Sequence, residues 1–267
     1  MDVGSGDRPT LGVLTQYWMA TTEQMHRVSA PSVRIEQTRR RLARLREEGL
    51  VDRITLPQAG RTRVWFPTPY GVQLASEWPE LRGHWPSRTV SDPTAARLKA
   101  GHTLTVTTSA LAILEDARRR GDVCQPLDWI PEVHHPIGSG EAVIPDALLY
   151  YRRGPADGTG GSMLRAFLEV DRATMGPERL ATKLTAYERV HRYVPVAPGR
   201  RTTLRERVLE EWRSATLSSL GAAAFMCLGP CGVRAPRPGR LQGPPCVGVA
   251  STSPQMGVLP QTFHFNV

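Results

Sequence analysis

The hydrophobic and polar positions in the first third of the chain predict three helices, a β-hairpin and a closing helix. Residues 11–17 have the pattern of a short apolar helix. Thr21 and Gln24 have the spacing of a capping box at the start of the second helix. The third helix is predicted over 33–48, with Ser32 as its N-cap.

This third helix should bury a stripe formed by Val33, Leu42 and Leu45, and Gly49 should end it. Two strand-like runs follow, LVDRITL and TRVWFPT, and the turn residues PQAGR between them predict a hairpin. The segment TPYGVQLASEW then begins the closing helix. Residues 77–100 contain several prolines and mixed polarity, and we expect them to form a linker.

From Gly101 the pattern changes to one helix, three strands and a second helix. The first helix should end at Gly121, and the strands are predicted within PLDWIPEVHH, EAVIPDALLYYRR and SMLRAFLEVDRAT. The pattern of the last helix places on one face Leu180, Leu184, Tyr187 and Val190. The chain as a whole is therefore predicted to be α+β, with a second domain over 101–213.

Positive charge is concentrated on the predicted third helix and hairpin. The formal net charge is +9 and the pI is near 10.0, so a polyanion is the first partner to consider. Between residues 34 and 46 a single acid, Glu36, accompanies six arginines: Arg34, Arg39, Arg40, Arg41, Arg44 and Arg46. The hairpin adds Arg61 and Arg63.

The order helix, helix, basic helix, hairpin, helix resembles a winged helix-turn-helix domain, and LARLREEGLVDR is similar to the third helix and first wing strand of that family. The resemblance implies that residues 11–76 bind double-stranded DNA. The basic helix would lie in the major groove, and Arg61 and Arg63 at the neighbouring backbone or minor groove. The alternative is a solvated helix face used for protein contact, in which nearby charges pair: Arg41, Arg44 and Arg53 with Glu47, Glu48 and Asp52.

Acidic residues in the predicted second domain are the candidate chemistry. Because strand side chains alternate, one face of the third strand carries Arg165, Phe167, Glu169 and Asp171, and the other carries Leu164, Ala166, Leu168 and Val170. If this strand pairs with the preceding one as a hairpin, Asp146 comes close to both acids. Three neighbouring carboxylates must be neutralised, by Mg²⁺ or Mn²⁺ or by nearby cations. The purely structural alternative is salt bridging to Arg165, Arg172 and Lys183.

This arrangement resembles the PD-(D/E)xK nuclease superfamily, in which PD on the second strand and an acid on the third hold a divalent metal. The resemblance implies a restriction-endonuclease-like domain, with Asp146, Glu169 and Asp171 as ligands of Mg²⁺ and with endonuclease or nickase activity. The lysine position of that motif is Asp171 here, so Lys183 on the next helix is expected to reach back in its place. Tyr187 is expected to contact phosphate.

The chain also resembles actinobacterial replication-relaxation proteins over residues 11–195. In that family a winged-helix start is followed by H-x-L-x-V, IPDA, LEVDR-T and K-L-x-x-Y. The matching residues are His102, Leu104 and Val106; Ile144 to Ala147; Leu168 to Arg172 with Thr174; and Lys183, Leu184 and Tyr187. The resemblance implies a role in plasmid or mobile-element replication or transfer, with DNA and replication or transfer proteins as partners. Two alternatives are a non-enzymatic transcriptional regulator whose second domain dimerises or senses a ligand, and a partner-recruiting adaptor.

The two ends of the chain have different patterns from the rest. Residues 1–10 are expected to be disordered, and 214–267 a low-complexity tail rich in Gly and Pro, with GAAAFMCLG as its one candidate strand. No acid follows Glu211, which motivates the hypothesis that the reading frame shifted near residue 213.

Neither a signal-peptide pattern nor a long apolar run is present, so we expect a cytoplasmic protein that does not bind membranes. Cys227 and Cys231 lack a second pair of His or Cys at zinc-site spacing, so zinc is not expected. His134 and His135 are expected at the surface of a strand end.

Overall fold

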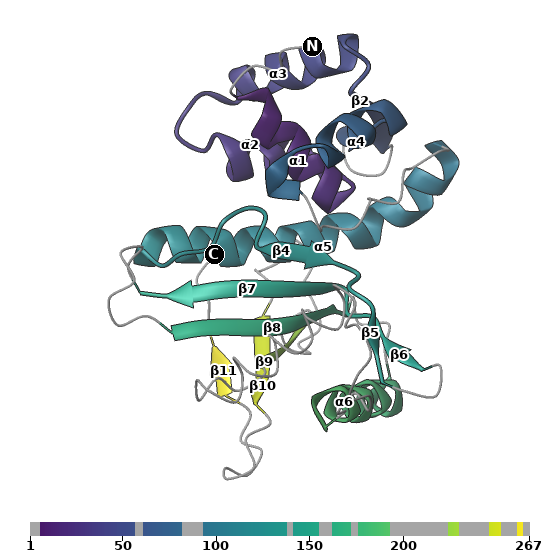
Figure 1. The fold of residues 1–267 in the computed structure, drawn as a ribbon, viewed down its shortest axis with the longest axis vertical. Helices are drawn as coiled ribbons and strands as arrows, with labels where there is room; N and C mark the ends of the chain where they lie inside the picture. Colours follow the sequence, from purple (N-terminus) through teal and green to yellow (C-terminus); the bar gives the residue numbers. More distant parts are fainter. Residues whose placement is uncertain are drawn as a thin grey trace, which may run out of the picture. The chain divides into compact units, whose positions relative to one another are not determined.

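The computed structural model describes residues 6–56, 61–81, 93–137, 141–154, 162–171, 176–192, 224–229, 246–251 and 261–263 (Figure 1). The chain divides into two compact units. The first comprises Met1–Arg118 with Cys124–Ile130, and the second comprises Arg119–Val123 with Pro131–Val267. Helices and strands occur in both, which confirms the α+β class. No helix among the described residues is long and apolar enough to cross a membrane.

The first unit is built from helices around a small sheet. Its elements are α1 (Asp7–Tyr17), β1 (Ala20–Thr21), α2 (Thr22–Ser29), α3 (Ile35–Glu47), β2 (Val51–Leu56), β3 (Thr62–Pro67), α4 (Pro69–Ser76), a 3₁₀ turn (Pro79–Leu81) and α5 (Pro93–Arg120). The sheet order is β1-β3-β2, with both pairs antiparallel. The predicted hairpin is therefore confirmed, and β1 adds a third strand to it.

The start of α2 follows the predicted capping box. The backbone N–H of Gln24 donates to Thr21 Oγ1 (3.1 Å), and the backbone N–H of Thr21 donates to Gln24 Oε1 (2.9 Å). These reciprocal bonds satisfy amides that the first turn of a helix otherwise leaves without partners.

The start of α3 differs from the prediction. Its N-cap is Arg34, which is extended and makes no side-chain capping bond, so Ser32 is not the cap. Val33 precedes the first turn and is 39% exposed, so its predicted place in the buried stripe is wrong. Leu42 and Leu45 are fully buried as expected, and Gly49 has a φ of +71°, a left-handed conformation that ends the helix.

Two segments are more ordered than the sequence predicted. Part of the N-terminal stretch 1–10 is helical, because α1 begins at Asp7, and part of the predicted linker 77–100 is helical, because α5 begins at Pro93. Proline is favoured in the first turn of a helix, where its missing N–H has no intrahelical partner. Ala96 and Ala100, four residues apart, are buried among hydrophobic residues of the sheet and of the position before β1: Ile54, Val64, Phe66 and Met19.

Hydrogen bonds attach α5 to α2 within the first unit. The Arg27 guanidinium donates to both Glu115 oxygens at 2.6 Å. The Arg118 guanidinium donates to the carbonyl oxygens of Arg27 (2.7 Å) and Val28 (2.6 Å), near the end of α2. The first unit therefore includes most of a helix that the sequence assigned to the second domain.

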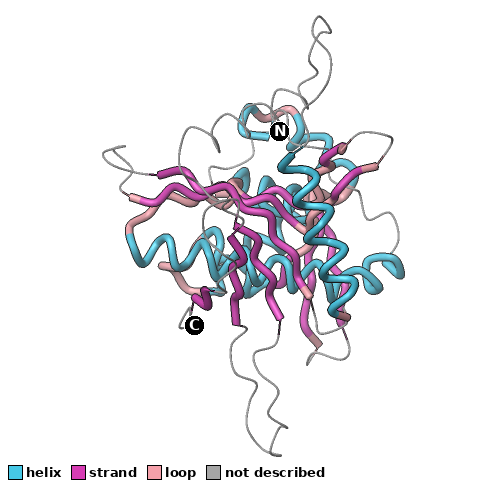
Figure 2. Tube along the Cα trace, turned by 90° about the horizontal axis from the view of Figure 1, so that it is seen from below, coloured by secondary structure: helices cyan, strands magenta, loops and turns pink. Residues whose placement is uncertain are grey.

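The second unit is built on a sheet. Its elements are β5 (His135–Pro136), β6 (Ala142–Val143), β7 (Ala147–Arg153), β8 (Ser162–Val170), α6 (Pro177–Arg192), β9 (Ala224–Gly229), β10 (Cys246–Ser251) and β11 (Gln261–Phe263). Strand β4 (Trp129–Pro131) has residues in both units. The strands follow the order β11-β10-β9-β8-β7, and β8 and β9 are parallel while the other neighbours are antiparallel. Figure 2, seen from below, shows α6 lying against the strands of this unit.

The predicted pairing of β7 with β8 is confirmed, with Ala147 opposite Leu168. The predicted strand EAVIPDALLYYRR is instead two strands, because β6 ends at Val143 and β7 begins at Ala147. Pro145 lies in the break, where its lack of an N–H prevents a ladder bond. The predicted strand PLDWIPEVHH is likewise divided between β4 and β5.

The C-terminal stretch 214–267 contains three strands, where the sequence predicted one within a low-complexity tail. The predicted strand in GAAAFMCLG corresponds to β9, which pairs with β8. Strands β10 and β11 were not expected. They extend the sheet as antiparallel neighbours, β10 of β9 and β11 of β10, in a stretch whose sequence shows little strand periodicity. The frame-shift hypothesis remains a hypothesis.

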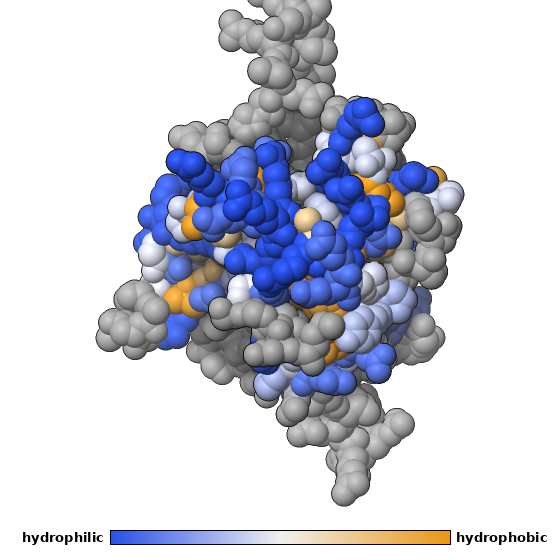
Figure 3. Space-filling view, turned by 90° about the horizontal axis from the view of Figure 1, so that it is seen from above, coloured by the Kyte–Doolittle hydropathy of each residue, from blue (hydrophilic) through white to orange (hydrophobic). Residues whose placement is uncertain are grey.

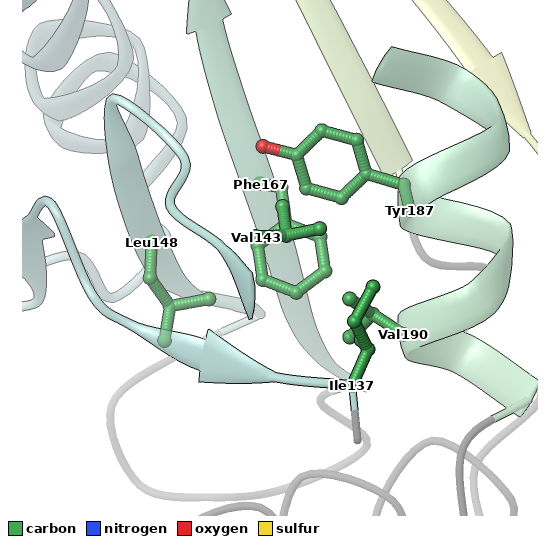
Figure 4. Close-up of a cluster of buried hydrophobic side chains, with 6 residues drawn as sticks. All are labelled: Ile137, Val143, Leu148, Phe167, Tyr187 and Val190. Atoms are coloured by element: carbon green, nitrogen blue, oxygen red, sulfur yellow. The ribbon is translucent and has the colours of Figure 1, made fainter. Parts of the chain in front are cut away.

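The core of the second unit lies between α6 and the strands. Figure 4 shows its buried side chains, which are Ile137, Val143, Leu148, Phe167, Tyr187 and Val190. Leu184 is 37% exposed, so its predicted place on the buried face of α6 is wrong. Tyr187 and Val190 are buried as predicted.

Candidate functional site

Glu169 is the centre of a polar network at the edge of the second unit's core. Strand alternation puts Phe167 and Glu169 on one face of β8, and both side chains contact Tyr187 of α6. Tyr187 Oη donates to Glu169 Oε1 (2.6 Å), and Lys183 Nζ donates to Glu169 Oε2 (2.5 Å). Lys183 and Tyr187 are four residues apart, which places them on one face of the helix. The sequence predicted that Lys183 would reach back to this carboxylate, and it does.

Asp146 joins this network from the break between β6 and β7. Its Oδ2 accepts from the backbone N–H of Val170 (2.6 Å), next to Glu169. Its backbone carbonyl accepts from the N–H of Glu132 (3.3 Å). The predicted approach of Asp146 to the end of β8 is therefore confirmed.

Burial decides the protonation behaviour of this network. Glu169 is 1% exposed, and burial raises the pKa of its carboxyl, while the hydrogen bonds from Lys183 and Tyr187 oppose the rise. Burial also raises the pKa of Tyr187, and the neighbouring Glu169 raises it further. The tyrosine hydroxyl therefore keeps its proton and acts as a donor to Glu169. The predicted contact of Tyr187 with phosphate stays a prediction.

Asp171 lies just beyond the end of β8 and is half-buried. Arg172 and the side chain of Arg165, the other predicted neutralising groups, lie outside the described residues. The described part of the chain contains no group of three or more His, Cys, Asp or Glu side chains that could hold a metal ion. Two of the three predicted metal ligands, Asp146 and Glu169, do come together, with Lys183 as the cation at their side.

His135 is buried, which corrects the surface position predicted for it, while His134 is exposed. The imidazole of His135 packs edge-on against the Phe167 ring, with 4.9 Å between ring centroids. Neither of its ring nitrogens has a hydrogen-bond partner among the described residues. The apolar surroundings lower the pKa of His135 to about 4.

The arginines of α3 and the β2–β3 hairpin divide into two groups. Arg39 pairs with Glu36 (3.1 Å), and Arg46 pairs with Asp52 (2.9 Å). Arg41 and Arg44 contact the carboxylate of Asp7, and Arg44 also lies 3.6 Å from Glu48. Of the predicted charge pairs, Arg44 with Glu48 is therefore confirmed, while Arg53 stacks over the Trp65 ring (5.5 Å).

The second group has no acidic partner among the described residues and is exposed. We call it the exposed arginine set, and it consists of Arg34, Arg40, Arg61 and Arg63. Figure 3 looks from the side on which α3 lies in Figure 1, and most of the described surface on this side is hydrophilic. Two of these arginines come from α3 or its N-cap, and two from the hairpin.

Asp7 is a residue that the sequence reasoning missed. It lies in the first turn of α1 and is 3% exposed, so the arginines of α3 are bound to a buried acid. Its position seven residues into a stretch rich in Gly and Asp suggested disorder. The only local signal was an acid preceding an apolar helical pattern, as is common in first helical turns.

The chain matches the family model described as replication-relaxation over residues 11–203. This match covers most of the chain, and the protein belongs to the replication-relaxation family. No curated protein and no solved structure matches it.

Proposed function

We propose that this replication-relaxation protein binds double-stranded DNA through its first unit and acts in plasmid or mobile-element replication or transfer. The observation that carries the proposal is the exposed arginine set. Guanidinium groups that have no acidic partner in the described part of the chain are available to phosphates and to guanine edges, and their charge attracts the nucleic acid.

The topology of the first unit supports a winged helix-turn-helix. The elements α1, β1, α2, α3, β2 and β3 follow one another in the order that such a domain requires, with β1 completing the sheet of the hairpin. In this proposal α2 and α3 form the helix-turn-helix, α3 enters the major groove with its N-terminal part, and the hairpin is the wing. Arg34 and Arg40 would then face the phosphates that border the groove, and Arg61 and Arg63 the adjacent backbone.

Fluorescence anisotropy with a labelled duplex, repeated over a series of salt concentrations, tests this proposal. The variant Arg40→Gln/Arg63→Gln removes two charges from the proposed interface. The control Arg97→Gln/Lys99→Gln removes two charges from exposed positions on α5. Each lost phosphate contact should lower the slope of log K against log salt by about 0.9, so the first variant should lose about twice that and the control should keep the wild-type slope. Equal slopes for both variants, or no binding by the wild type, would refute the proposal.

A second candidate activity, Mg²⁺- or Mn²⁺-dependent nicking of DNA, rests on the convergence of Asp146 and Glu169 beside Lys183. In this proposal the carboxylates of Asp146 and Glu169 would hold the ion. A bound divalent ion supplies a water of lowered pKa and charge stabilisation at phosphate. Each oxygen of Glu169 accepts one hydrogen bond and keeps a second lone pair that would be available to the ion, and Lys183 beside Oε2 would be placed to neutralise a phosphate.

Conversion of supercoiled plasmid to nicked circle tests this second activity, with Asp146→Asn and Glu169→Gln as isosteric variants. Binding of Mn²⁺, followed by electron paramagnetic resonance in the absence of DNA, gives a readout independent of cleavage. Nicking and Mn²⁺ binding that both variants abolish would establish a metal-dependent nuclease. Intact DNA binding without either would instead favour a non-enzymatic, winged-helix regulator.

A further inference from the structure

Asp7 connects α1 to the second half of α3 through two arginines. Its Oδ1 lies 3.4 Å from Arg41 Nε, and its Oδ2 contacts the guanidinium of Arg44. The side chain of Asp7 is 4% exposed, whereas those of Arg41 and Arg44 are 28% and 55% exposed. A buried acid thus holds two cations that still reach the surface.

The backbone before α1 also fits this contact closely. A Cβ at Gly6 would meet the guanidinium of Arg41, so the absence of a side chain there leaves room for Arg41 to approach Asp7. Thr10 Oγ1 donates to the carbonyl of Gly6 (2.9 Å), which fixes the turn. The N-terminal end of α1 and the carboxylate of Asp7 therefore form a fixed binding position for the guanidinium of Arg41.

A guanidinium that is bound to a buried carboxylate is less available to a DNA phosphate than an exposed guanidinium without an acidic partner. If Arg41 or Arg44 moved to a DNA phosphate, the buried carboxylate of Asp7 would lose one of its two compensating cations. Removing a charged partner from a buried ion is strongly unfavourable. A phosphate at the surface, where water screens the attraction, gives back only part of this cost. Both arginines should therefore stay with Asp7 when DNA binds.

We infer that Asp7 withholds Arg41 and Arg44 from the DNA backbone, so that the exposed arginine set makes the phosphate contacts of this surface. This inference rests on the DNA binding proposed above. Withholding two cations reduces the number of counterions released on binding, and this lowers the affinity for DNA of any sequence. It also leaves the N-terminal half of α3, which enters the groove in helix-turn-helix proteins, as the part of the helix that contacts the duplex.

Salt-dependent binding of a labelled duplex to single variants of the full chain tests the inference. Arg40→Gln should lower the salt slope by about 0.9, whereas Arg41→Gln and Arg44→Gln should leave it unchanged. Asp7→Asn should steepen the slope by about 0.9 to 1.8, because it releases one or both arginines. The matched control is Glu80→Gln, which removes one acid from the exposed pair with Arg8 and changes the net charge equally. It should keep the wild-type slope.

The outcomes separate this inference from the proposed function. If the wild type binds DNA and Arg41→Gln lowers the slope as much as Arg40→Gln, Asp7 does not withhold these arginines, although the proposed function stands. A folded Asp7→Asn variant with the wild-type slope would overturn the inference in the same way. If Asp7→Asn does not fold, as circular dichroism would show, the three arginine variants decide alone. No binding by the wild type would overturn both proposals.

Discussion

Replacing His135 with leucine should make the second unit less sensitive to acid. His135 is 3% exposed and both its nitrogens lack partners in the described part of the chain, so its neutral ring is tolerated and its charged ring is not. Burial lowers the pKa of this histidine from its usual 6.5 to about 4. The unfolded state therefore binds the proton more strongly than the folded state. The contribution to stability is fully present above pH 6.5 and is lost as the pH falls towards 4.

The size of the effect follows from these two pKa values. When the pH falls from about 7 to about 4.5, the unfolded state gains more from proton binding than the folded state does, and the free energy of unfolding should fall by about 2 kcal/mol. This corresponds to a change of some tens of fold in the equilibrium for opening. Leucine has a similar volume and no titrating group, so the variant should lack this part of the pH dependence.

Hydrogen exchange of β7 and β8, measured by mass spectrometry at matched pH, tests this reasoning in the unit concerned. Comparing the two proteins at each pH cancels the intrinsic pH dependence of exchange and that of the other acidic groups. The ratio of wild-type to variant exchange rates should rise by some tens of fold from about pH 7 to about pH 4.5. A ratio that changes less than about threefold would show that His135 is not held in its neutral form by burial.

Two further substitutions have expected outcomes that follow directly from contacts. Tyr187→Phe removes the hydroxyl that donates to the buried Glu169 Oε1. Urea denaturation should therefore show a free energy of unfolding that is lower by about 1.5 to 3 kcal/mol. A decrease below about 0.5 kcal/mol would contradict a hydrogen bond to a buried charged group. Gly71→Ala places a Cβ against the backbone carbonyl of Leu50, inside van der Waals contact, so α4 must move away from the sheet. The midpoint of thermal unfolding of the Gly71→Ala variant should fall by several degrees. The control Ala75→Gly should lower the midpoint less, because it removes only a buried methyl group and some helix propensity.

Features that depend on neighbours in sequence could be predicted. The capping box at Thr21 and Gln24 needs only a spacing of three residues and a helix to follow it. The pairing of β7 with β8 follows from two apolar runs around a Gly-rich loop. From this pairing and the helical position of Lys183, the approach of Asp146 and Lys183 to the end of β8 could also be predicted.

Features that depend on contacts between distant parts of the chain could not be predicted from the sequence. His135 is buried because Phe167, more than thirty residues later, packs against it, and two adjacent histidines before a proline carry no sign of this. Asp7 is buried because α3 brings two arginines to it. Val33 and Leu184 fit a helical stripe by spacing, but their exposure is set by where a helix begins and by how far its partner surface extends.

The measurement that tests the central claim most directly is photocrosslinking of the full chain to a bromodeoxyuridine-substituted duplex, with the crosslinked peptides identified by mass spectrometry. The account predicts crosslinks in α3 and in the β2–β3 hairpin, the elements that carry the exposed arginine set. Crosslinks found only in the second unit, between Pro131 and Arg192, would contradict DNA binding by the first unit.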